Sequence, residues 1–71
     1  MITKIGLVAG EIWEYLDYHN KIANLETLIR GLKKDKELIL MSIGWLAREG
    51  HIVLEGEAPN YSVRLTSVRG K

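Results

Sequence analysis

The chain has 71 residues, no cysteine, two histidines and a formal net charge of +1. A chain of this length has room for one small core, whose net stability rarely exceeds about 3–5 kcal/mol. The lack of cysteine excludes disulfides and thiolate zinc sites, and His19 and His51 are too few for a histidine-based metal site. We therefore expect one domain over residues 1–71, without metal or cofactor, in which self-association adds stability.

The distribution of charge is more informative than its sum. Residues 1–20 carry one cation against three anions, residues 21–50 six against four, and residues 51–71 three against two. The centre of the chain is thus mildly basic. No apolar run is long enough to span a membrane, and no charged leader precedes an apolar segment, so we expect a soluble cytoplasmic protein that enters no membrane.

Apolar residues near the N-terminus recur at helical spacing, which predicts a helix over residues 3–18. Thr3 is a suitable cap for its start, and His19 with Asn20 closes its end. The apolar stripe consists of Ile5, Val8, Ala9, Ile12 and Leu16.

The next segment predicts two more helices after a stub strand at residues 21–23. Asn24 is a good N-cap for the first of them, and Gly31 weakens its last turn and suits a tight bend. The second runs from about Asp35 to Glu49 and is terminated by Gly50. Two short helices joined by a few residues, with a glycine nearby, are the arrangement of a helix-turn-helix. The apolar positions of the first of these helices are Leu25, Leu28, Ile29 and Leu32.

The hydrophobic period then changes from that of a helix to that of a strand. Residues 51–55 and 61–66 alternate between apolar and polar side chains, and residues 56–60 have the composition of a hairpin loop. The expected fold is an α+β winged helix, with three helices and a small antiparallel sheet that carries a C-terminal β-hairpin wing. Residues 67–71 have little apolar content and are expected to fray.

Two motifs connect the chain with a known family. Gly44-Trp45-Leu46-Ala47-Arg48-Glu49-Gly50 precedes a strand, and Ala9-Gly10-x-x-Trp13-x-x-Leu16 lies on the first helix. Together they resemble a family of very small bacterial winged helix-turn-helix proteins that was long catalogued as a domain of unknown function. The resemblance runs from about Ile5 to Leu65. It implies a stand-alone winged helix with a role in nucleic-acid binding, and it brings no catalytic residues.

A basic cluster supports DNA binding. Affinity for DNA comes mostly from lysine and arginine contacts to phosphates, and four cations gather at the predicted turn and the start of the third helix. The alternative interpretation is a solvated turn in which the lysines neighbour Asp35 and Glu37, in surface pairs that contribute little. The four cations are Arg30, Lys33, Lys34 and Lys36.

The predicted wing argues against DNA binding. It carries Glu55 and Glu57, and carboxylates beside phosphates weaken association through like-charge repulsion. Arg64 on the second strand of the hairpin is a further candidate phosphate contact. Together with Arg69 and Lys71, it offsets the repulsion from Glu55 and Glu57 if these cations lie on the same side of the wing as the two carboxylates.

The third helix is apolar on more than one side. Its predicted core stripe consists of Ile39, Ser42, Ile43 and Leu46, whereas Leu38, Met41 and Trp45 form a second stripe where a DNA-reading helix needs polar side chains. This second stripe either packs within the chain, on the first helix or under the hairpin, or forms a homodimer interface. If it forms a homodimer interface, Leu7 and Trp13 of the first helix are expected to contribute to that interface, and this face cannot read the major groove of DNA.

No catalytic constellation is present: the histidines stand alone, and the serines lack a neighbouring base. Gly44 is interpreted as allowing close helix packing beside Trp45. We therefore predict a DNA-binding or transcription-associated module that is not an enzyme and has no small-molecule ligand. The alternative is a protein-interaction or homodimerisation module that uses the apolar outer face of the third helix, without binding DNA.

Overall fold

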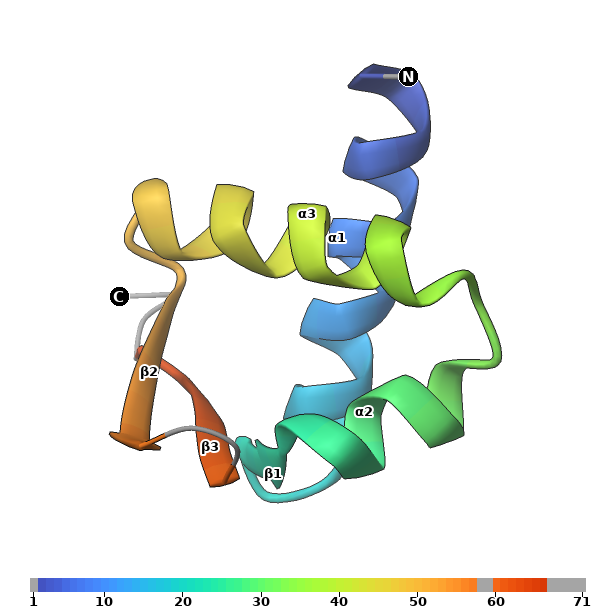
Figure 1. The fold of residues 1–71 in the computed structure, drawn as a ribbon. Coiled ribbons are helices and arrows are strands. Elements are labelled where there is room, and N and C mark those ends of the chain that lie inside the picture. The colour runs from blue at the N-terminus through green and yellow to red at the C-terminus, as the bar shows by residue number, and fades with distance from the viewer. Residues whose placement is uncertain (1, 58–59, 67–71) are drawn as a thin grey trace.

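The computed structural model describes residues 2–57 and 60–66. α3 crosses in front of α1, α2 lies below α3, and the hairpin formed by β2 and β3 descends from the C-terminal end of α3 (Figure 1). No helix in the described part of the chain is both long and apolar enough to cross a membrane. The predicted tail at residues 67–71 lies outside the described residues. The elements are α1 (Ile2–Tyr18), β1 (Ile22–Asn24), α2 (Leu25–Leu32), α3 (Lys36–Arg48), β2 (Ile52–Glu57) and β3 (Asn60–Leu65).

The three strands form one antiparallel sheet in the order β1-β3-β2. The hairpin ladder continues to the pair Glu57–Asn60, so the predicted loop over residues 56–60 is wrong: Gly56, Glu57 and Asn60 belong to the strands. Gly56 has a φ of +96°, and a Cβ there would lie 2.6 Å from the carbonyl oxygen of Asn60. Gly56 has the residue type of a loop, but in the structure it allows the close approach of two paired strands.

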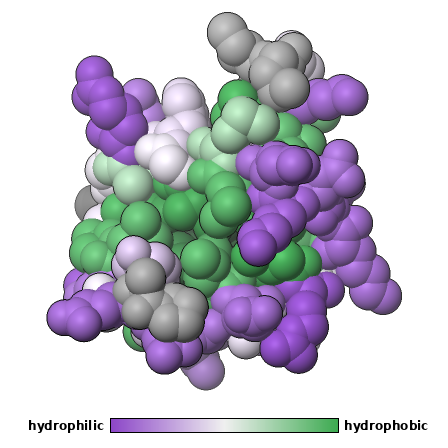
Figure 2. Space-filling model, viewed as in Figure 1, coloured by the Kyte–Doolittle hydropathy of each residue, from purple (hydrophilic) through white to green (hydrophobic). Residues whose placement is uncertain are grey.

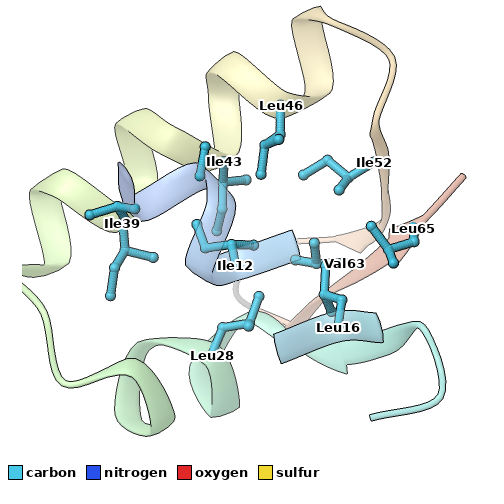
Figure 3. Close-up of a cluster of buried hydrophobic side chains, with 11 residues drawn as sticks. Ile12, Leu16, Leu28, Ile39, Ile43, Leu46, Ile52, Val63 and Leu65 are labelled. Atoms are coloured by element: carbon cyan, nitrogen blue, oxygen red, sulfur yellow. The ribbon is translucent and has the colours of Figure 1, made fainter. Parts of the chain in front are cut away.

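The core lies between α1, α3, α2 and the inner face of the sheet (Figure 3). The predicted core stripe of α3 is confirmed, because all four of its residues are buried. The buried hydroxyl of Ser42 donates to the carbonyl oxygen of Leu38 at 2.8 Å and lies 3.2 Å from that of Ile5, which connects α3 with α1. The buried apolar residues are Val8, Ala9, Ile12, Leu16, Leu28, Ile39, Ile43, Leu46, Ile52, Val63 and Leu65.

The helix ends follow the predictions in part. The side chain of Asn24 accepts a hydrogen bond from the backbone N–H of Glu26 at 2.8 Å, which confirms this residue as the cap of α2. Gly50 has a φ of +80° and donates to the carbonyl oxygen of Ala47, as expected of a residue that terminates α3. Thr3 is not a cap, because α1 already begins at Ile2.

Two glycines have roles other than those predicted. Gly31 does not make the bend, since Lys33 takes the left-handed conformation that ends α2. A Cβ at Gly31 would lie 2.9 Å from ring atoms of Tyr15, so the glycine lets α2 approach that ring. Gly44 does not serve packing against another element of the described chain, because a Cβ there would have no atom within 4 Å beyond its chain neighbours and its own helix backbone.

The elements occur in the order of a winged helix: a helix, a short strand, a helix-turn-helix formed by α2 and α3, and a hairpin wing. The predicted α+β class, with three helices and a three-stranded antiparallel sheet, is confirmed.

Candidate nucleic-acid interface

The turn between α2 and α3 gathers four exposed cations. Arg30 lies in the last turn of α2, Lys33 is its C-cap with a φ of +57°, Lys34 follows in the turn, and Lys36 is the first residue of α3. The left-handed conformation of Lys33 ends α2, and α3 begins three residues later at Lys36. The fold therefore brings together all four residues that the sequence predicted at this turn.

The turn keeps most of its positive charge available. Lys34 Nζ lies 3.7 Å from Glu11 Oε2 on α1, which partly neutralises this one lysine. Among residues 2–57 and 60–66, Arg30, Lys33 and Lys36 form no ion pair, and the surface pairs with Asp35 or Glu37 that the alternative interpretation foresaw do not form. Three cations at this turn thus remain free for phosphates.

The wing lies apart from this turn. The basic turn leads into the start of α3 and the hairpin follows its end, so the two sites lie at opposite ends of the helix (Figure 1). With 13 residues, α3 separates them by about 20 Å at 1.5 Å per residue. The structure therefore does not bring Arg64 into the cluster of the other four predicted contacts.

Arg64 is also held by an acid. Its Nη2 donates to Glu55 Oε2 at 2.7 Å across the hairpin. This hydrogen bond, reinforced by the opposite charges, lowers the pKa of Glu55 and raises that of Arg64. The pair neutralises one of the two wing carboxylates, but it occupies the arginine that the sequence offered to phosphate.

The outward face of α3 is poorly equipped to read bases. At 100° per residue, the side opposite the core carries Glu37, Met41, Gly44 and Arg48, all exposed. Arg48 alone offers hydrogen-bond donors to a base edge, and Glu37 repels phosphate. Arg48 was not among the predicted contacts, although counting around the helix from Glu37 places it on the same face.

The five residues predicted for a dimer interface divide into two groups. Leu38 and Trp13 are half-buried and pack against the core, and for Leu38 this fits the alternative that the second stripe packs within the chain. Met41, Trp45 and Leu7 remain exposed, at 43%, 46% and 65% of their surface. Leu7 and Trp13 lie about 120° apart around α1, so the structure does not place all five in one patch.

Further apolar surface lies on the face of the molecule that Figure 2 shows. Apolar side chains gather in the middle of the face on which α2, α3 and the hairpin are all visible (Figure 2). Leu40 of α3 and Leu54 of β2 are also large apolar side chains with substantial exposure. No cluster of three metal-ligating side chains occurs among the residues that the structure describes.

The sequence of this chain is similar to that of a known protein family and of a relative of nearly the same length. A family model described as "Winged helix-turn-helix domain (DUF2582)" matches residues 1–65. The chain is also similar to the uncharacterised protein MJ1608 of Methanocaldococcus jannaschii, with 32% identity over 66 residues, which cover 92% of this chain and 94% of that protein. No solved structure is significantly similar to the chain. The family match spans nearly the whole chain, and the chain therefore belongs to this family of winged helix-turn-helix domains.

Proposed function

We propose that the chain acts as a single domain that binds double-stranded DNA through the turn between α2 and α3, without catalysis. The observation that carries this proposal is the set of three exposed cations at one turn, Arg30, Lys33 and Lys36, which form no ion pair in the described part of the chain. A cytoplasmic location belongs to the proposal, because the protein must share a compartment with DNA.

Binding of this kind is dominated by phosphate contacts. Each lysine or arginine that neutralises a phosphate releases counterions, so affinity depends strongly on salt and little on base sequence. The apolar and acidic residues on the outward face of α3 favour weak sequence discrimination. Arg64 adds little, because its guanidinium is engaged by Glu55.

The test is a charge-reversal experiment on the turn. Lys33→Glu combined with Lys36→Glu is expected to abolish binding of a mixed-sequence duplex in fluorescence anisotropy at about 50 mM salt. Glutamate in the first turn of a helix is favourable, so Lys36→Glu leaves α3 intact. Lys4→Glu, an exposed reversal on α1, is the matched control and is expected to retain most of the binding. No binding by the wild type, or equal loss in the control, contradicts the proposal.

The alternative function is protein–protein interaction through α3 without DNA binding. The exposure of Met41 and Trp45 favours it, because Met and aromatic residues are enriched at the centres of protein interfaces. Self-association in light scattering, together with absence of duplex binding at low salt, supports this alternative. A monomer that binds the duplex contradicts it.

A further inference from the structure

The outward face of α3 has a symmetric pattern. Glu37, Met41, Gly44 and Arg48 follow one another at spacings of four, three and four residues, and we call them the outer stripe. This spacing keeps the four positions on one side of a helix that packs along another. Because the spacing reads the same in both directions, an antiparallel copy of α3 presents the same stripe in reverse order.

Gly44 is the least expected member of the outer stripe. Glycine in a helix interior is destabilising relative to alanine, and nothing within 4 Å of a Cβ at this position requires it. Its φ is not positive, so backbone conformation does not require glycine either. Gly44 therefore leaves a gap in the row of side chains on the outer stripe, one helical turn from the exposed Met41, and we call this gap the notch.

We propose that two copies of this chain pair through α3, antiparallel about a two-fold axis between Met41 and Gly44. In this arrangement Met41 of each copy enters the notch at Gly44 of the other. Glu37 of each copy lies opposite Arg48 of the other. The charges at the ends of the stripe are therefore complementary to those of a second copy, and the small and large residues at its centre are complementary in shape.

Trp45 supplies the apolar anchor of this pair. It is about half exposed and lies beside the outer stripe, on the same flank of α3 as Leu38. The two-fold axis places the same flanks of both copies on one side of the helix pair, so Trp45 covers Met41 of the second copy. An apolar centre of Trp and Met between charged ends matches the usual anatomy of protein interfaces.

The pairing does not depend on DNA binding. Each α3 begins at Lys36, so the two basic turns lie at opposite ends of the antiparallel pair, about 20 Å apart for helices of 13 residues. Neither turn is buried by the pairing. The wild type can therefore dimerise without binding DNA, or bind DNA without dimerising, and the two proposals fail separately.

The experiment is a charge-swap series in sedimentation equilibrium, with circular dichroism as the check that each variant folds. Glu37→Arg or Arg48→Glu alone is expected to raise the dimer dissociation constant at least about tenfold, because each places two like-charged pairs at the ends of the stripe. The double variant is expected to recover wild-type affinity to within about threefold, since the pairs are restored with reversed sign. Glu14→Arg, an exposed reversal on α1, is the matched control and is expected to change nothing.

A second variant tests the notch. Gly44→Leu places a large side chain at this exposed position, where the Cβ itself meets no described atom beyond the helix backbone and the two chain neighbours, so the variant is expected to fold and to lose dimerisation. A wild type that stays monomeric at millimolar concentration overturns the proposal. A double charge-swap variant as weak as its single parents overturns it as well.

Discussion

Replacing Gly44 with alanine tests whether this position serves anything inside the chain. The glycine lies within α3, it has no positive φ, and a Cβ would meet no atom of the described residues within 4 Å beyond its chain neighbours and helix backbone. The added methyl group therefore causes no clash in the monomer. What remains is the effect of the residue on the helix itself.

That effect is stabilising. Alanine is favoured over glycine in a helix interior by about 0.8–1.0 kcal/mol. For a domain of about this size, 1 kcal/mol corresponds to a rise of roughly 4–8 °C in the melting temperature. Gly44→Ala is thus expected to raise the free energy of unfolding of the monomer by about 1 kcal/mol.

Gly31→Ala is the matched control in the preceding helix. Alanine is also the better helix former in the last turn of α2, but the new Cβ would lie 2.9 Å from ring atoms of Tyr15. That ring stacks on His19 at 4.0 Å, so it must shift and disturb this contact. Gly31→Ala is therefore expected to gain clearly less stability than Gly44→Ala, or to lose stability.

Both variants are compared by urea denaturation, followed by circular dichroism, at concentrations where sedimentation shows monomers. The expected order of stability is Gly44→Ala, then wild type, with Gly31→Ala at or below the wild type. A Gly44→Ala monomer that is less stable than the wild type refutes the reasoning, because it means that the glycine is packed against another part of the chain.

Three further substitutions test other parts of the account. Asn24→Ala removes the cap of α2 and is expected to lower the free energy of unfolding by about 1 kcal/mol in urea denaturation; no change contradicts the capping role. Leu28→Ala empties a fully buried site at a cost of about 2–5 kcal/mol, which leaves much of so small a domain unfolded in thermal melts. Arg64→Gln is expected to return the lowered pKa of Glu55 toward its ordinary value of 4.5 in an NMR titration. Since the pKa of Glu55 is lowered in the folded state, the ion pair stabilises the fold at pH values above the ordinary pKa, and this stabilisation is lost as the pH falls through the folded-state pKa. A Glu55 titration that Arg64→Gln leaves unchanged contradicts the pairing.

The elements of the fold were predictable because hydrophobic period and capping chemistry are local properties. The change of period after Gly50 separates the helices from the hairpin, and Asn24 marks the start of α2. The end of the hairpin was not predictable, since Gly56 and Asn60 have the composition of a loop and only the strand register shows that they pair. The role of Gly31 was hidden for a similar reason, because Tyr15 meets it only when α1 and α2 pack together.

The candidate site was predictable in its composition but not in its electrostatics. The four cations of the turn are close in sequence, so the cluster follows directly from the predicted helix ends. The acid that approaches Lys34 is Glu11, which lies 23 positions earlier and reaches the turn only through helix packing. The bond between Arg64 and Glu55 likewise depends on the register of the hairpin, which places the two side chains on the same face.

The salt dependence of duplex binding by the wild type tests the proposed function most directly. Three free cations at the turn predict that the logarithm of the association constant falls with the logarithm of salt concentration with a slope of about −2.7 per chain, at about −0.9 per neutralised phosphate. Between about 50 mM and about 200 mM salt, this slope weakens binding roughly 40-fold. A slope near zero, or no binding at the lower salt concentration, contradicts the account.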